Sequence, residues 1–283
     1  MKARAWWLAG VLAGCIAGGA AQAADPREDA QAAVEASERG DFDTAIHLLT
    51  QALATPGLPA GQRVDLTLHR AFAYDEDGDY DRAIDDYSSV IAQRPHAAQV
   101  YFRRGIAHRE KGEYQKALAD FDVAMGRAAP EWPFIYGDRG VVRFALGRFA
   151  EAAEDFAHVV ALDPTDQYAV LWLHIARNRA GEGNGAEFAR DAAKSERDVW
   201  PRPLLAFYLG DGTAGEVRKA AAEGGAEAQQ NKDCETDFFL GEYALLHGHA
   251  DGAKPLFRKV VASCSPSLGV YAGAAGELKR VGG

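Results

Sequence analysis

The chain has few of the sequence features that mark enzymes. Its three cysteines include no C-x-x-C pair, and none of its eight histidines belongs to an H-E-x-x-H motif. There is no nucleophile elbow, and the glycine run at 181–185 is not followed by Gly-Lys-Ser/Thr, which excludes a phosphate loop. His247 and His249 have no third His or Cys nearby, so we expect no metal site there. The sequence predicts a non-enzymatic protein without a cofactor.

The chain also lacks an excess of positive charge and, after residue 24, a long hydrophobic run. It carries 31 Lys and Arg against 41 Asp and Glu, a formal charge of −10. Such a chain repels phosphate backbones, so nucleic-acid binding is disfavoured. No apolar run after residue 24 has the length of a transmembrane helix.

The first 23 residues have the pattern of a secretory signal peptide. Two basic residues precede an apolar segment at 5–20, and residues 21–23 form an A-x-A cleavage site. Residues 12–15 also fit a bacterial lipobox, which would leave a lipidated Cys15 and an outer-membrane lipoprotein. We favour soluble export, because only about seven apolar residues precede the lipobox. Either route predicts a mature protein outside the cytoplasm, and soluble export predicts the periplasm.

A 34-residue period runs through the middle of the chain. In residues 98–131, positions 8, 11, 15, 17, 20, 24 and 27 are Gly105, His108, Gly112, Tyr114, Ala117, Phe121 and Ala124. The same pattern occurs in register around Ala71 upstream and Gly140 downstream. Small residues at positions 8 and 20 let two helices touch, and aromatic residues at 17 and 24 fill the space between successive hairpins. This spacing resembles the tetratricopeptide repeat, a pair of antiparallel helices.

The resemblance implies an all-α fold, a right-handed superhelical solenoid of helical hairpins with connecting and capping helices. The pattern divides the chain into five segments. These are the signal peptide (1–23), N-terminal helices with a degenerate first repeat (24–63), the repeat array (64–198), connecting helices (199–233), and a C-terminal hairpin with a capping helix (234–283).

Cys234 and Cys264 occupy positions 1 and 31 of the C-terminal repeat. In an antiparallel hairpin, the start of the first helix lies beside the end of the second. Export places the protein in a compartment that permits disulfides. The sequence therefore predicts a disulfide between these two cysteines, and two buried free thiols are the alternative.

Partner binding in such arrays usually uses the concave face, which is lined by positions 2, 5, 9, 12 and 13 of the first helices. Residues at these positions predict an apolar groove edged by arginines: Phe102, Ile106, Arg109, Phe134, Val141, Phe144, Tyr168, Leu171, Ile175 and Arg179. Phe134 and Phe144 are ten residues apart and are expected on one side of their helix. Alternatively, the protein's own terminal helices or a second copy cover several of these residues.

Three arginine–aspartate pairs recur in register at positions 7 and 23. They are Arg70 with Asp86, Arg104 with Asp120, and Arg139 with Asp155. Because these positions face each other across a hairpin, we interpret each pair as an internal ion pair. In the alternative interpretation, the arginines bind a partner's carboxylates.

Two blocks in the C-terminal half are more specific than the repeat pattern. Residues 207–210 read Phe-Tyr-Leu-Gly and residues 239–243 read Phe-Leu-Gly-Glu-Tyr. With these blocks, residues 64–280 look like the NlpI family of bacterial cell-envelope repeat lipoproteins. The resemblance implies a non-enzymatic adaptor that dimerises, holds a periplasmic processing protease and brings it to peptidoglycan hydrolases. The sequence departs from that family at its leader, where an ordinary cleavage site competes with the lipobox.

Together these features predict a periplasmic adaptor or scaffold that binds other envelope proteins, such as a protease or a peptidoglycan hydrolase. The expected partners are proteins, including a second copy of the chain, and not nucleic acids. Membrane attachment is expected only if Cys15 is lipidated. The alternative function is that of a structural subunit of an envelope assembly or secretion complex.

Overall fold

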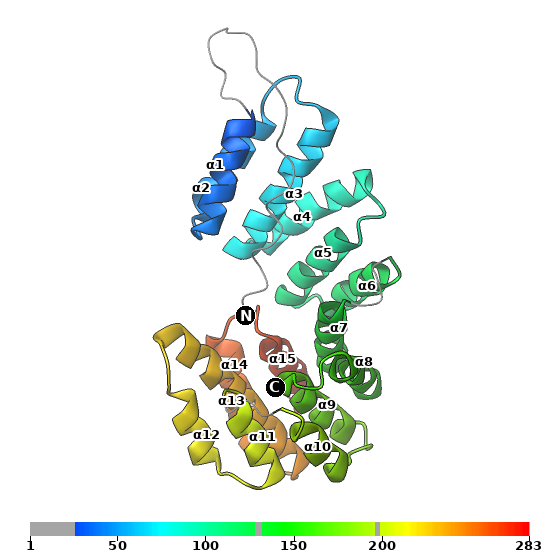
Figure 1. Ribbon diagram of the computed structural model, residues 1–283, viewed down its shortest axis with the longest axis vertical. Helices are drawn as coiled ribbons and strands as arrows, with labels where there is room; N and C mark the ends of the chain where they lie inside the picture. The colour runs from blue at the N-terminus through cyan, green and yellow to red at the C-terminus, as the bar shows by residue number, and fades with distance from the viewer. Residues whose placement is uncertain (1–25, 128–131, 196–198, 283) are drawn as a thin grey trace. The chain divides into compact units, whose positions relative to one another are not determined.

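The computed structural model describes residues 26–127, 132–195 and 199–282 (Figure 1). All regular secondary structure in these ranges is helical, which confirms the predicted all-α fold. None of the described helices is long and apolar enough to cross a membrane. The predicted signal peptide, the lipobox and Cys15 lie outside the described residues.

Most of the helices form consecutive antiparallel pairs. In chain order they are α1 (Pro26–Glu38), α2 (Phe42–Leu53), α3 (Ala60–Asp77), α4 (Tyr80–Gln93), α5 (Ala98–Glu110), α6 (Tyr114–Met125), α7 (Pro133–Ala145), α8 (Phe149–Leu162), α9 (Gln167–Arg179), α10 (Gly185–Ala192), α11 (Arg202–Leu209), α12 (Ala214–Ala221), α13 (Ala226–Leu246), α14 (Ala250–Ser263) and α15 (Gly269–Arg280).

Glycine at repeat position 15 sets the turn inside each hairpin. The backbone angle φ is 84° at Gly78, 80° at Gly112 and 77° at Gly147. Only glycine adopts this left-handed conformation without steric cost, so the first helix ends there and the chain reverses. The three short turns between paired helices therefore follow directly from the repeat pattern.

Small residues at position 8 let the two helices of a hairpin pack against each other. A Cβ atom on Gly140 would lie 2.9 Å from the ring of Phe156, and one on Gly241 would lie 2.7 Å from the ring of Phe257. Both distances are too short for a real contact. The phenylalanines at position 24 therefore need glycine opposite them, as the spacing predicts.

The chain divides into two compact units, Met1–Ala107 and His108–Gly283. The first unit contains α1 to α4 and most of α5. Among its described residues, buried side chains form one cluster around Leu49 and Leu66 and another around Tyr87 and Val100. The division falls within the repeat array predicted at 64–198.

In the second unit, the C-terminal helices pack against helices of the repeat array. The hairpin of α7 and α8 stacks on α9, and the short helices α10 to α12 lead to the hairpin of α13 and α14. Helix α13 then contacts α9, and α15 contacts α7, α13 and α14 (Figure 1). Contacts between helices far apart in the sequence therefore complete this interior.

The structure contains the predicted disulfide. Cys234 near the middle of α13 is bonded to Cys264 directly after α14, and their Cα atoms are 6.0 Å apart. The bond joins the two helices of the C-terminal hairpin, as the repeat positions of the two cysteines predict.

Two of the three predicted arginine–aspartate ion pairs are confirmed. Arg70 donates to both carboxylate oxygens of Asp86, at 2.7 and 3.0 Å. Arg139 does the same with Asp155, at 3.1 and 2.6 Å. Arg104 and Asp120 belong to different units, so their pairing stays a prediction.

The Arg70–Asp86 pair provides a test of internal ion pairing in the first unit. We expect Asp86→Ala to lower the free energy of unfolding by about 1.5–3 kcal/mol, because it removes both hydrogen bonds from a partly buried guanidinium. The neighbouring Asp85 is exposed, and Asp85→Ala is expected to change stability by less than about 0.5 kcal/mol. Urea unfolding measures both. Equal effects of the two substitutions, or strict additivity of Asp86→Ala with Arg70→Ala, would argue against the internal pair.

Candidate functional site: the concave face and the helix that covers it

The ten predicted groove residues are distributed over both units. Phe102 and Ile106, on α5, belong to the first unit, and the other eight belong to the second. Phe102 is partly buried and Ile106 is buried.

In the second unit, the apolar groove residues lie in the interior. Phe144, Leu171 and Ile175 are 0% exposed, and Val141 is also buried. The ring centroid of Phe144 lies 5.2 Å from that of Trp172 and 6.2 Å from that of Phe238. A partner could therefore reach these side chains only if the C-terminal helices moved away.

Helix α15 fits closely over this face because its inner side is made of glycines. A Cβ atom on Gly276 would lie 2.8 Å from the Cα atom of Ala145 in α7. A Cβ atom on Gly273 would lie 2.6 Å from the ring of Phe238 in α13. Small residues at these positions let α15 approach the backbone of α7 directly. The concave face of this unit thus already holds a helix of the same chain.

The two arginines expected at the groove edge also have partners within the chain. Arg109 is 5% exposed, forms ion pairs with Asp138 and Glu110, and donates to the backbone oxygen of Ser267 at 3.3 Å. Arg179 contacts Glu242 at 3.0 Å and Glu277 at 2.7 Å. Ser267 and Glu277 belong to the C-terminal segment. That segment therefore supplies the acceptors that a partner protein would have supplied.

The expectation that Phe134 and Phe144 share one side of α7 is wrong. Phe134 is 63% exposed, whereas Phe144 is buried. Ten residues at 3.6 per turn fall about 80° short of three full turns, which is enough to separate an interior position from a surface position. Tyr168 is partly buried, and its hydroxyl donates to Glu235 at 2.9 Å.

Sequence reasoning missed the glutamates that pair with Arg179. Glu242 lies within the apolar run 238–246 of α13, and Glu277 lies among alanines and glycines in α15. Isolated carboxylates in such surroundings indicate buried, paired groups. That signal was present in the sequence, but it does not identify the partner.

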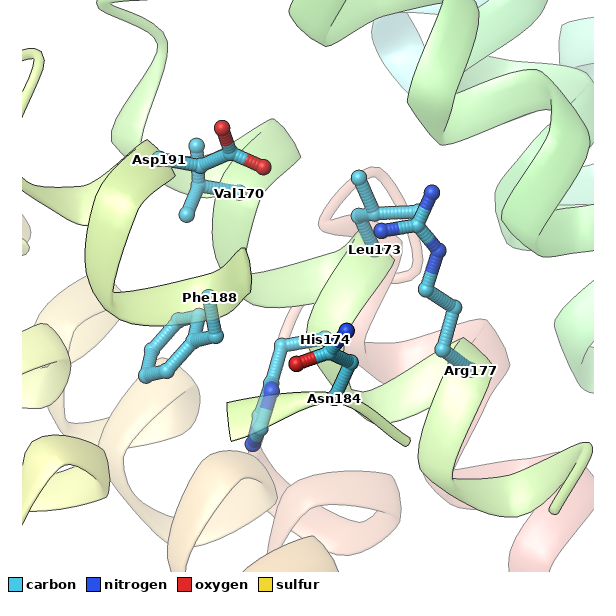
Figure 2. A pocket seen from close by; sticks show the side chains of 7 residues that line it. All are labelled: Val170, Leu173, His174, Arg177, Asn184, Phe188 and Asp191. Atoms are coloured by element: carbon cyan, nitrogen blue, oxygen red, sulfur yellow. The ribbon is translucent and has the colours of Figure 1, made fainter. Parts of the chain in front are cut away.

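A small recess lies between α9 and α10 (Figure 2). It is lined by Val170, Leu173, His174, Arg177, Asn184, Phe188 and Asp191. Its cavity volume is about 10 Å³, far below the range of about 300–1,000 Å³ found for ligand pockets. His174 stacks on Phe188 with 3.9 Å between ring centroids, and burial lowers the pKa of His174 to about 4. The imidazole is therefore neutral at pH 7 and belongs to the packing.

The described residues contain no group of three or more His, Cys, Asp or Glu side chains placed to hold a metal ion. The candidate binding surface is the face formed by the first helices of the stacked hairpins. Such a face is a feature of repeat arrays.

Residues 68–131 match the sequence model of the tetratricopeptide repeat. Solved structures of tetratricopeptide type share the fold. A repeat protein from Parabacteroides merdae has a TM-score of 0.58 at 19% identity, covering 89% of this chain and 98% of that chain. MamA protein has a TM-score of 0.54 at 19% identity, covering 62% of this chain and 98% of that chain. At such identities the likeness shows the fold alone. The finer resemblance to the NlpI family stays a prediction.

Proposed function

We propose that the protein is a non-enzymatic tetratricopeptide adaptor that is exported to the periplasm and binds other proteins of the cell envelope. The observation that carries this proposal is the face formed by the first helices of the stacked hairpins. In the second unit this face is covered by the helix α15. Arrays of this kind generally serve as binding surfaces for protein segments. A processing protease or a peptidoglycan hydrolase is the partner class that the NlpI resemblance suggests.

The first unit is where we place partner binding. Its first helices α1 and α3 contact each other, and Phe72, at repeat position 9 of α3, is only partly buried. The guanidinium of Arg103 lies 5.1 Å from the centroid of the Phe72 ring. Residues 26–107 carry 14 carboxylates, eight arginines and no lysine. This charge favours a partner segment that combines an apolar anchor with basic residues.

The test begins with capture of partners from envelope extract by the mature protein, followed by measurement of Kd with the purified partner. We expect Phe72→Ala to weaken binding by about 1–3 kcal/mol, typical of an aromatic anchor. Phe42→Ala, on the second helix α2, is the matched control and is expected to leave Kd unchanged. Equal affinity of both variants and the wild type would exclude binding by this face.

The identity of the captured proteins separates the adaptor from its alternative. A protease together with a hydrolase supports the adaptor, whereas components of a secretion or assembly machine support the structural subunit. The intact mass of protein from the envelope distinguishes an unmodified Ala24 N-terminus from a lipidated Cys15.

A further inference from the structure

Four charged side chains from three helices meet in the interior of the second unit. They are Arg179 of α9, Glu242 of α13, and Glu277 and Arg280 of α15. Both glutamates are 0% exposed. One nitrogen atom, Nη1 of Arg179, contacts both carboxylates, at 3.0 Å and 2.7 Å. The two glutamates are therefore neighbours that share a single cationic partner.

The two glutamates are not equally paired. Oε1 of Glu277 accepts from Arg179 and also from Nη2 of Arg280, at 2.6 Å. Among the described residues, the ion pair of Glu242 is with Arg179, through Oε2. Oε1 of Glu242 and Oε2 of Glu277 have no hydrogen-bond partner among the described residues. Two buried carboxylate oxygens without donors are costly when both groups are ionised.

Aromatic side chains and a backbone carbonyl border the cluster. Phe149 of α8 lies beneath both guanidinium groups, with its ring centroid 4.5 Å from Arg179 and 5.0 Å from Arg280. Arg280 donates to the backbone oxygen of Ala145 in α7. Tyr208 of α11 also faces Glu242, but its hydroxyl donates to the backbone oxygen of Phe239 at 2.7 Å.

We propose that Glu242 and Glu277 share one proton at neutral pH, and that loss of this proton at alkaline pH loosens the contact of α15 with α9 and α13. Protonated Glu242 donates to the second oxygen of Glu277. This single hydrogen bond satisfies both bare oxygens and removes the repulsion between two buried carboxylates. Arg179 then holds Glu277 as a charged pair and Glu242 as a neutral acceptor.

Burial and the neighbouring Glu277 raise the pKa of Glu242 to about 8, which supports this arrangement. The folded protein therefore keeps a proton that the unfolded chain releases above its ordinary pKa of about 4.5. Stability contributed by this proton is complete below about pH 4.5. It declines as the pH rises towards about 8 and is lost above that value.

The experiment compares urea unfolding of Glu242→Gln with that of Glu154→Gln from about pH 5 to about pH 9. Glutamine keeps an acceptor for Arg179 and a permanent donor for Glu277, whereas Glu154 is exposed on α8 and controls for the change in net charge. The quantity compared is the equilibrium constant for folding of Glu242→Gln divided by that of Glu154→Gln. We expect this ratio to rise at least about tenfold between pH 5 and pH 8, because only Glu154→Gln retains a Glu242 that loses its proton. A ratio that does not change with pH would overturn the proposal.

A second measurement detects the protonated carboxyl group directly, by infrared spectroscopy of the wild-type protein. The infrared carbonyl band of a protonated carboxylic acid is expected at pH 7 and is expected to disappear by about pH 9. Burial also raises the pKa of Glu235 and that of Asp155, so Glu235→Gln and Asp155→Asn are measured alongside, and a band that persists in both variants belongs to the Glu242–Glu277 pair. Absence of that band at pH 7 would refute the shared proton, even if Glu242→Gln fails to fold.

Amide hydrogen exchange locates the effect. At about pH 8.5, peptides from α15 are expected to exchange faster in the wild type than in Glu242→Gln, while peptides from α8 exchange alike. Identical exchange in α15 would show that the proton does not control this helix.

Discussion

Phe144→Ala is expected to lower the free energy of unfolding of the second unit by about 3–5 kcal/mol. The ring is fully buried and lies among Phe149, Trp172 and Phe238, with centroids 5.0 to 6.2 Å away. Truncation to alanine leaves a cavity between helices that come from distant parts of the sequence. Urea unfolding followed by circular dichroism measures the loss.

Phe134→Ala is the matched control, because it removes the same side chain from the other end of the same helix. Phe134 is largely exposed, so we expect a change below about 0.5 kcal/mol. If Phe144→Ala instead kept full stability and weakened a partner, α15 would not cover this face in solution. The apolar groove predicted from the sequence would then be open.

Removal of the Cys234–Cys264 disulfide is expected to cost about 3–4 kcal/mol of stability. The bond closes a loop of 30 residues, and the chain-entropy model assigns this loss to greater freedom of the unfolded chain. The comparison is urea unfolding of the wild type with and without reductant, beside Cys234→Ser/Cys264→Ser. The double variant is expected to have the same free energy of unfolding as the reduced wild type, and this value is expected not to change when reductant is added.

Cysteine labelling gives an independent check. In denaturant without reductant, protein from the native envelope is expected to leave both Cys234 and Cys264 unlabelled, with one linked tryptic peptide. Labelling of both thiols under these conditions would contradict the disulfide.

The repeat pattern predicts contacts within a hairpin well. Gly140 must be small because Phe156 packs on it, and Gly112 must be glycine because the turn needs a positive φ. These constraints act between residues less than about 20 positions apart and recur with a fixed period. The Cys234–Cys264 bond, between residues 30 positions apart, was predicted from their places at the two ends of one repeat together with the expected export to a compartment that permits disulfides.

The pattern does not predict which faces of the array remain exposed. Phe144 and Arg179 occupy positions that face a partner in an open array, yet here they face α13 and α15. Glu277 and Gly276 lie outside the repeat register, and no period relates them to Arg179 or Ala145. Contacts of this kind depend on the path that the chain takes after α9, which the repeat does not encode.

The fit of α15 on α7 also sets an order of events during folding. Arg280 bonds to the backbone of Ala145, and 135 positions separate the two residues. The hairpins of α7, α8 and α9 contain mainly local contacts and can form early, whereas this contact must wait for the whole intervening chain. Until then the apolar side of α7 and α9 stays uncovered and open to association with other unfolded chains. A chaperone that shields this side would be needed only until α15 has packed against α7.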